Sequence, residues 1–476
     1  MIKRVVLLLV LLTFAHSTTT LAQSLSDLLG HLFESDPCQF QDRSTPGEGF
    51  LCLESRTLIN NRPHDPRHFQ GPWQNLFVPF NTALATELTA LPLPSPASGF
   101  TYSLDAGTGE VTRSTESFGP IFAERAETIG RRRFAMGFTY QYFTFDSFND
   151  FDLARMPLVF EHDDAAASGG LADVVTSVVS IDTRVGQFSA YFTYGLTDFL
   201  DMSYAIPVLD VDMRASATAV LRRVGSSGNP SVHFFPNRGV DDPSNRRDAG
   251  DIASPFYGDR AEFEISGRAA GIGDIIIRTK ATVAKAEKTG LALGLDMRLP
   301  TGNEEDFLGS GTLGVTPFVV VSLAGRVSPH GNVAYQWNGK SSLADSAEFG
   351  DNGEILEERE TGDLPDQLLY VFGADIGIHP NFTLALDFLG RWVIDGFQPM
   401  AEDFVTRLIP GSPLPQETFT SLSVGEGASF NTATAAIGIK ANVGGNLLVD
   451  MNLLVKLDDN GLGDVLTPLL GIEYCF

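Results

Sequence analysis

Apolar and polar residues alternate with a period of two along most of the chain after Phe134. The segments 291–299 and 446–458 show this alternation most clearly. A period of two places successive side chains on opposite faces of a β-strand. Each segment also has about the ten residues that a tilted strand needs to cross a bilayer. The pattern therefore predicts strands with one apolar and one polar face.

The links between these strands alternate between short and long, as the periplasmic turns and outer loops of transmembrane barrels do. The last strand ends on the aromatic residue Phe476, which resembles the terminal strand of bacterial outer-membrane barrels. A soluble β-sandwich does not keep such a strict alternation, so we predict an all-β protein, an antiparallel transmembrane β-barrel of about twelve strands, or fourteen at most. The predicted strands are residues 134–145, 174–194, 199–220, 273–284, 291–299, 312–326, 332–338, 368–378, 382–394, 431–443, 446–458 and 465–476.

The first 22 residues have the features of a secretory signal peptide. Lys3 and Arg4 precede an apolar run from Val5 to Phe14, and small residues lead to Ala22. The run is too short to span a bilayer, and its flanks are those of a cleaved signal. We therefore expect cleavage near Ala22 and export through the Sec route to the outer membrane of a Gram-negative cell.

Residues 23–130 lack the pattern of wall strands and form an N-terminal segment before the barrel, residues 131–476. Helical spacing occurs at 24–34 and at 81–91, and residues 99–115 are compatible with a small hairpin. Three placements remain open: a plug in the lumen, a periplasmic domain, or an additional pair of wall strands. We favour the plug.

Composition and charge argue against several classes of function. The net charge of −26 disfavours nucleic acid as a partner, because phosphate binding needs a basic face. The eight His residues follow no metal-binding spacing, so we expect no metal and no cofactor. No GxSxG elbow occurs, and we expect no enzymatic activity. Cys38 and Cys52 are candidates for a disulfide in the oxidising periplasm.

Charged residues within the predicted strands fall on the inward-facing side. An Arg or Lys that faced lipid near the midplane would cost about 2–4 kcal/mol. The two signs alternate, which favours a paired network that braces the wall and holds the N-terminal segment; the alternative is an ion-lined pore. The wall candidates are Asp274, Arg278, Lys280, Asp296, Arg298, Asp375, Asp387 and Arg391, and their expected partners are Arg113, Glu124, Arg125 and Glu127.

One predicted strand changes phase at Pro207. The apolar face carries Tyr204 and Ile206 before the proline, but Leu209 and Val211 after it. Because proline cannot donate a ladder hydrogen bond, the change predicts a bulge or kink. Such a kink is either a curvature device or a lateral gap through which an apolar solute leaves for the bilayer.

Short motifs along the chain resemble those of one outer-membrane family. The motifs are the run from Ser117 to Gly130, Tyr194-Gly195-Leu196-Thr197-Asp198, Gly271-Ile272-Gly273-Asp274, Leu299-Pro300-Thr301-Gly302, and the strand that follows Ser328-Pro329-His330. They are similar to motifs of the family named for the phenol-degradation meta pathway, and their order supports the resemblance. The resemblance implies a channel for aromatic or other hydrophobic small molecules. It also implies a distant similarity to long-chain fatty-acid channels, which carry an N-terminal plug.

The expected function is passive uptake of small hydrophobic compounds, with aromatic compounds as one candidate class. The expected partners are the lipid bilayer and lipopolysaccharide, the solute, and the barrel-assembly machinery, which would bind the C-terminal strand. The alternative is a structural or adhesive barrel that acts through its acidic outer loops.

Overall fold

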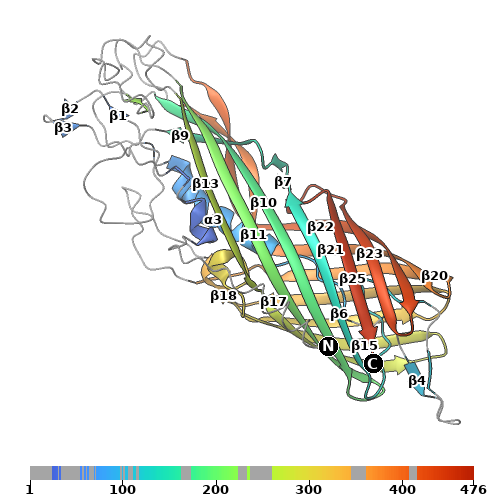
Figure 1. Cartoon of the computed structure of the whole chain (residues 1–476). Helices are drawn as coiled ribbons and strands as arrows, with labels where there is room; N and C mark the ends of the chain where they lie inside the picture. The colour runs from blue at the N-terminus through green and yellow to red at the C-terminus, as the bar shows by residue number, and fades with distance from the viewer. Residues whose placement is uncertain are drawn as a thin grey trace, which may run out of the picture.

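Twelve strands of the described chain pair with their neighbours and close into an antiparallel barrel (Figure 1). The computed structural model describes residues 24–30, 32–33, 54–55, 58–59, 62–63, 69, 71–96, 99, 102–104, 111–113, 117–161, 173–222, 233–235, 260–344, 361–406 and 415–476. The barrel strands are β6 (Phe134–Phe145), β10 (Val174–Gly195), β11 (Leu200–Arg222), β14 (Ile275–Lys285), β15 (Thr289–Leu299), β16 (Gly314–Leu323), β17 (Val327–Asn338), β20 (Gln367–His379), β21 (Phe382–Val405), β22 (Thr418–Gly444), β23 (Leu447–Lys456) and β25 (Leu466–Cys475).

Neighbours in the barrel wall follow one another along the chain, and β25 pairs with β6 to close it. Every predicted strand overlaps one of these twelve strands, so the predicted fold class is confirmed. The links at residues 196–199, 286–288, 324–326, 380–381 and 445–446 are short and lie at one end of the barrel, which we call the turn end. The longer connections lie at the other end, the loop end.

The wall is taller on one side than the sequence pattern predicts. β10 and β11 pair without a break from Gly195↔Asp201 at the turn end to Val174↔Arg222 far beyond the barrel (Figure 1). Two further strands flank this extension: β9 (Met156–Glu161) pairs with β10, and β13 (Arg260–Ile272) pairs with β11. β21 and β22 also extend beyond the barrel, and they pair as far as Val405↔Thr418.

These extensions correct the predicted strand list: β21 and β22 continue beyond the predicted strands 382–394 and 431–443, and β13 was not among the predicted strands. In β13 the exposed positions include Arg260, Glu262 and Glu264, whereas the alternate positions are half-buried. The outward face of this strand is therefore polar, and its apolar residues, such as Phe263 and Ile265, pack inward, the reverse of the barrel strands.

The predicted bulge at Pro207 is absent from the β10–β11 pair. Ser189 pairs with Pro207 in an unbroken register, and the odd-numbered residues of β11 are buried from Asp201 to Leu221. On its other edge β11 changes partner here, from β14 to β13, and the Gly273 amide donates to the Pro207 carbonyl at 2.8 Å.

The apparent phase change at Pro207 thus has a different cause. Before Pro207 the outward face of β11 is apolar, with Tyr204 and Ile206. Beyond it the outward face is polar, whereas the inward residues Leu209, Val211 and Met213 join a hydrophobic core. The backbone keeps its phase, and the apolar face changes from the outside to the inside.

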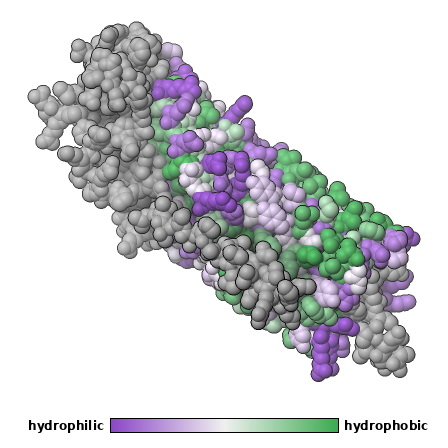
Figure 2. All heavy atoms as spheres, in the orientation of Figure 1, coloured by the Kyte–Doolittle hydropathy of each residue, from purple (hydrophilic) through white to green (hydrophobic). Residues whose placement is uncertain are grey.

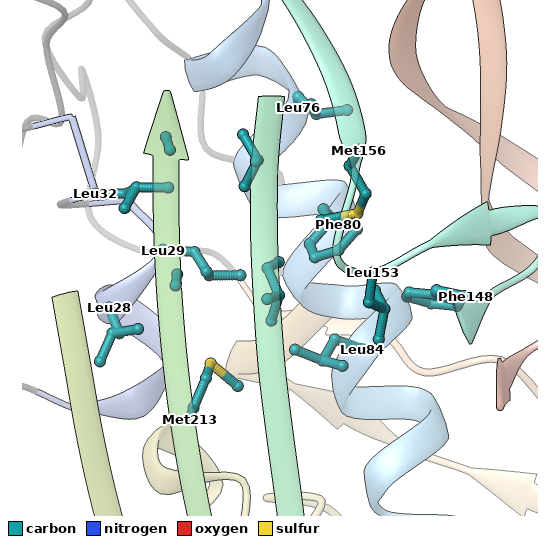
Figure 3. Close-up of a cluster of buried hydrophobic side chains, with 14 of the residues drawn as sticks. Leu28, Leu29, Leu32, Leu76, Phe80, Leu84, Phe148, Leu153, Met156 and Met213 are labelled. Carbon is teal, nitrogen blue, oxygen red and sulfur yellow. The ribbon is translucent and has the colours of Figure 1, made fainter. Parts of the chain in front are cut away.

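Two helices of the N-terminal segment fill the inner side of the extension. Helix α2 (Leu25–Leu28) contacts β13, and helix α3 (Gly71–Leu88) contacts β9, β21 and β22. Their leucine and phenylalanine side chains join one buried hydrophobic cluster with residues of β9, β10 and β11 (Figure 3). A Cβ atom at Gly267 of β13 would lie 2.7 Å from Leu25, so glycine allows α2 to approach the strand. Helix α3 begins ten residues before the predicted helix and contains Pro79. Packing of Leu76 and Phe80 offsets the hydrogen bond that the proline removes.

The N-terminal segment also reaches the turn end. The predicted hairpin at 99–115 is present as β4 (Tyr102–Leu104) and β5 (Val111–Arg113), and β4 lies near the C-terminus (Figure 1). This hairpin is not part of the barrel sheet, so it does not supply additional wall strands. The other short elements are β1 (Glu54–Ser55), β2 (Leu58–Ile59), β3 (Arg62–Pro63), β7 (Ser147–Phe148), β8 (Phe151–Asp152), β12 (His233–Phe234), β18 (Lys340–Ser341), β19 (Gly362–Asp363), β24 (Leu462–Gly463), and the 3-10 helices η2 (Glu304–Asp306) and η3 (Ser342–Ala344).

The outward face of the barrel is rich in large apolar side chains. Figure 2 shows hydrophobic residues gathered over the barrel, whereas hydrophilic residues are prominent over the extension of β10 and β11. Val319, Phe372, Ile437, Met451 and Leu470 are among the exposed apolar residues. Within the described residues no helix has the length and hydropathy to cross a membrane. The predicted signal peptide and the predicted disulfide between Cys38 and Cys52 lie outside the described residues.

Candidate functional site

The barrel encloses a cavity of about 350 Å³ between its wall and the N-terminal segment. One side of the cavity is formed by residues 87–95 and another by Phe122 and Glu124. The inner faces of the wall strands and the connection between β23 and β25 supply the rest. The wall residues are Phe143, Phe145, Ile276, Arg278, Asp296, Arg298, Thr316, Phe318, Asn332, Ala334, Gln336, Gln367, Leu369, Val371, Leu389, Gly390, Arg391, Thr432, Thr434, Leu454, Lys456, Asn460, Leu462, Asp464 and Thr467.

Aromatic side chains give the cavity much of its apolar surface. Phe143 and Phe145 of β6 have ring centroids 5.8 Å apart, and both are buried. Phe318 carries the Arg278 guanidinium 4.9 Å above its ring. Aliphatic residues of β20, β21 and β23 complete this lining. The cavity can therefore hold an apolar body of small size.

Residues 117–130, which we call the lumen segment, run across the lumen on the turn-end side of the cavity. This stretch has no helix or strand, so its backbone amides need other acceptors. Thr383 Oγ1 accepts from the Phe118 amide at 2.8 Å, and Ser322 Oγ accepts from the Ala126 amide at 3.0 Å. Inward-facing polar residues of the wall therefore hold the lumen segment by its main chain.

Glu124 is the central charge of the lumen segment and is only 3% exposed. Lys280 donates to its carboxylate at 3.0 Å, and Arg278 and Ser95 also bind it. Arg278 makes two further bonds to Asp296, at 2.7 and 2.5 Å. Burial alone would raise the pKa of the Glu124 carboxyl, but Lys280 and Arg278 lower it below its usual value. Glu124 is therefore held as a carboxylate between two cations.

A second charge cluster lies closer to the turn end. Arg125 donates to Asp375 at 3.1 Å, and both side chains are buried. His330 Nε2 lies 2.7 Å from Asp387, and the same Asp387 accepts from the Phe122 amide at 3.2 Å. Gly119 has φ +80°, and a Cβ atom there would lie 2.6 Å from the Arg125 guanidinium. Glycine at this position lets the main chain pass over the buried arginine.

A third contact ties helix α3 to the wall near the loop end. Arg391 of β21 binds Glu87, and Glu87 also accepts from the Leu462 amide at 3.1 Å. Arg391 in addition donates to Thr432 at 3.2 Å through Nε. Since Glu87 is only 6% exposed, the helix buries a carboxylate that the wall must neutralise.

Asp274 and Arg298 lie at a corner where two of the sequence motifs meet. The Asp274 carboxylate accepts from the Gly302 amide at 3.1 Å and from the Ser310 amide at 2.8 Å. Thr301 Oγ1 donates to the Gly273 carbonyl at 2.7 Å. Arg298 Nε lies 3.6 Å from Asp274. These motif residues close the junction of β13 and β14 and fold the following loop onto it.

The structure thus places most of the predicted charges in or beside the lumen and pairs wall residues with the lumen segment. Glu127 accepts from Ser322 Oγ at 3.1 Å. Arg113 lies in β5, but its side chain is outside the described part of the chain. Sequence reasoning did not select Glu87, His330 or Gln367 as site residues. His330 and Gln367 lie just before the predicted strands 332–338 and 368–378, so the inward parity of those strands, continued by one or two residues, was the available signal. Glu87 lies on a helix and had none.

Comparisons with known proteins address the motifs directly. The family model described as "Putative MetA-pathway of phenol degradation" matches residues 163–352. The resemblance drawn from the motifs is confirmed. The stretch of this chain that the family model matches contains β10 to β17, and with them the corner at Asp274 and Arg298. No curated protein matches the chain.

Several solved outer-membrane structures are similar to the chain at low identity. An outer membrane channel from Pseudomonas putida F1 is 13% identical and covers 74% of this chain and 99% of its own, with a TM-score of 0.38. The toluene transporter TbuX from Ralstonia pickettii is 9% identical, covering 73% and 90%, with a TM-score of 0.30. A FadL homologue from Pseudomonas aeruginosa is 9% identical, covering 72% and 89%, with a TM-score of 0.28.

Proposed function

We propose that this protein is an outer-membrane channel for passive uptake of small, mainly hydrophobic molecules. The observation that carries the proposal is the cavity of about 350 Å³ inside the barrel, with phenylalanine and aliphatic side chains on several of its walls. Binding sites for small organic molecules are mostly apolar, with a few polar groups that orient the ligand. The family match supports the same class of function.

The N-terminal segment acts as a plug in this proposal. A solute enters from the loop end, rests in the cavity, and meets the lumen segment before the turn end. Glu124, Arg125 and Glu87 each bind a wall residue of opposite charge, so the plug is held at several heights. Passage then requires a local displacement of the lumen segment, and transport follows the gradient of the solute.

The outward apolar surface supports insertion into a lipid bilayer. Charged residues of the barrel strands lie mostly inside, where the cost of facing lipid is avoided. The loop end would face outward into the lipopolysaccharide leaflet, and the turn end would face the periplasm. The C-terminal strand β25, which closes the barrel, is the segment offered to the barrel-assembly machinery.

Uptake by whole cells tests the proposal. A deletion strain should take up toluene more slowly than the complemented strain, whereas uptake of a small sugar stays the same. Ala334→Phe, which adds a ring to the cavity wall, should reduce toluene uptake. The matched control is Ala435→Phe, because Ala435 pairs with Phe388 on the outward face of the barrel.

Each other outcome points to a different function. A parallel loss of sugar and toluene uptake would support a general porin. Unchanged uptake of both would contradict a channel and support a structural or adhesive barrel.

A further inference from the structure

Five buried polar atoms of cavity-lining residues have no hydrogen-bond partner among the described residues: Oε1 of Glu87, Nε of Arg298, Oδ1 of Asn332, Oε1 of Gln367 and Nη1 of Arg391. Two of them lie on adjacent strands: Oε1 of Gln367, a residue that is 2% exposed, and Nη1 of Arg391. Both side chains line the cavity. A buried polar group without a partner costs free energy, so each atom favours a ligand that supplies the missing bond.

The two side chains come from neighbouring positions on one inner face. Leu369 of β20 pairs with Arg391 of β21, and Gln367 lies two residues before Leu369 on the same side. Long side chains at such diagonal positions can reach a common point. Neither atom bonds to the other, so an acceptor and a donor are both left for a ligand.

The rest of Arg391 is already bound. Its Nη2 binds Glu87 and its Nε donates to Thr432, which holds the guanidinium in place and neutralises its charge. Three other cations line the cavity. Arg278 is neutralised by Asp296 and Glu124, Arg298 lies 3.6 Å from Asp274, and Lys456 donates to the Gly461 carbonyl at 3.1 Å. The free donor therefore has hydrogen-bonding capacity but little uncompensated charge.

We infer that Gln367 and Arg391 recognise a hydroxyl group, so that the channel prefers neutral molecules with one hydroxyl on an otherwise apolar body. A hydroxyl oxygen accepts from Arg391 Nη1 while its hydrogen is donated to Gln367 Oε1. A carboxylate can accept but cannot donate, and a hydrocarbon does neither. Leu369, Val371 and Leu389 lie beside the pair and receive the apolar body. This inference rests on the proposed function, because it names the solute class of the same cavity.

Three probes of similar size test the inference: toluene, benzyl alcohol and benzoate. Binding to the detergent-solubilised full-length protein is measured by calorimetry, with the signal of the detergent alone subtracted. Wild-type protein should bind benzyl alcohol more tightly than toluene or benzoate. Gln367→Leu removes the acceptor and should weaken binding of benzyl alcohol about tenfold while toluene binding stays the same.

Gln187→Leu is the matched control. Gln187 of β10 is also a buried wall glutamine, but it does not line the cavity and its Oε1 already accepts from Gln141 Nε2 at 3.3 Å. This variant should bind benzyl alcohol as the wild type does. If Gln367→Leu does not fold, Gln367→Met removes the same acceptor with an unbranched side chain, and gel mobility before and after boiling reports whether the barrel has formed.

The remaining outcomes separate this inference from the proposed function. If Gln367→Leu weakens toluene and benzyl alcohol equally, the residue acts by packing and hydroxyl recognition is wrong. If toluene binds and the ratio of the two probes is the same in every variant, recognition is wrong while the channel stands. If the wild type binds none of the probes and cellular uptake does not depend on it, the proposed function itself fails.

Discussion

Replacing Glu124 with Gln should release the lumen segment from the wall. Glu124 is buried between Lys280 and Arg278, and the substitution keeps its shape but removes its charge. Arg278 retains Asp296 as a partner, whereas Lys280 keeps a hydrogen bond to the Arg125 carbonyl at 2.9 Å and lies opposite Asp201 in the β11–β14 pair. The buried cation thus loses its hydrogen-bonded carboxylate, and loss of one partner of a buried pair typically costs 3–5 kcal/mol.

The magnitude expected here is about 3 kcal/mol, at the low end of that range, because Lys280 keeps its carbonyl contact. If this cost falls on the attached state of the lumen segment, the ratio of released to attached protein rises roughly a hundredfold, since 1.4 kcal/mol is a factor of ten. Hydrogen exchange of residues 117–130 in the reconstituted protein measures this ratio, and single-channel conductance shows whether release widens the pore.

Glu127→Gln is the control for this experiment. Glu127 lies three residues further along the lumen segment and accepts a hydrogen bond from Ser322. Glu127 forms no ion pair among the described residues, so the same substitution there should change hydrogen exchange little. Equal exchange in wild type and Glu124→Gln would refute the view that this carboxylate holds the lumen segment.

Three further predictions concern pH, closure and Pro207. The pKa of Glu124 is lowered in the folded protein, so its stabilising contribution is complete above the ordinary pKa of 4.5 and is lost as the pH falls toward the lower pKa of the folded state. Hydrogen exchange of residues 117–130 should therefore rise on acidification below about pH 4.5. The rise should be smaller in Glu124→Gln. A closed barrel should migrate faster on a detergent gel before boiling than after, and identical mobility would contradict closure. Pro207→Val should leave toluene uptake unchanged, because Ser189 and Gly273 already contact the strand on both edges without a gap; reduced uptake would instead support a lateral exit at this position.

The sequence by itself determined that the chain forms a barrel and which face of each barrel strand points toward the lumen. Period-two alternation is a local property of each strand, and the short and long links are read directly from the spacing between strands. The inward position of Arg278, Asp375 and Asp387 follows from the same parity, because a charge on the apolar face would be costly. Every strand that faces an apolar exterior was therefore predictable from its own residues.

The extension of β10 and β11 was not predictable in this way. Here the exterior is polar, and the apolar side chains of Leu209, Val211 and Met213 face inward, toward the helices of the N-terminal segment. At Pro207 the apolar residues change from the outward face to the inward face, and no feature of the strand's own sequence distinguishes this change from a bulge. Only the packing of α2 and α3 shows which face is the inside.

Tertiary structure alone also decided how charges are paired and where polar atoms remain free. Glu124 and Lys280 are 156 residues apart in the sequence, and many other opposite charges lie closer along the chain. Which of them meet depends on the register of the strands and on the path of the lumen segment through the lumen. The unpaired atoms of Gln367 and Arg391 likewise result from the exact set of neighbours at one level of the barrel, because a hydrogen bond depends on distance and angle that the order of residues does not specify.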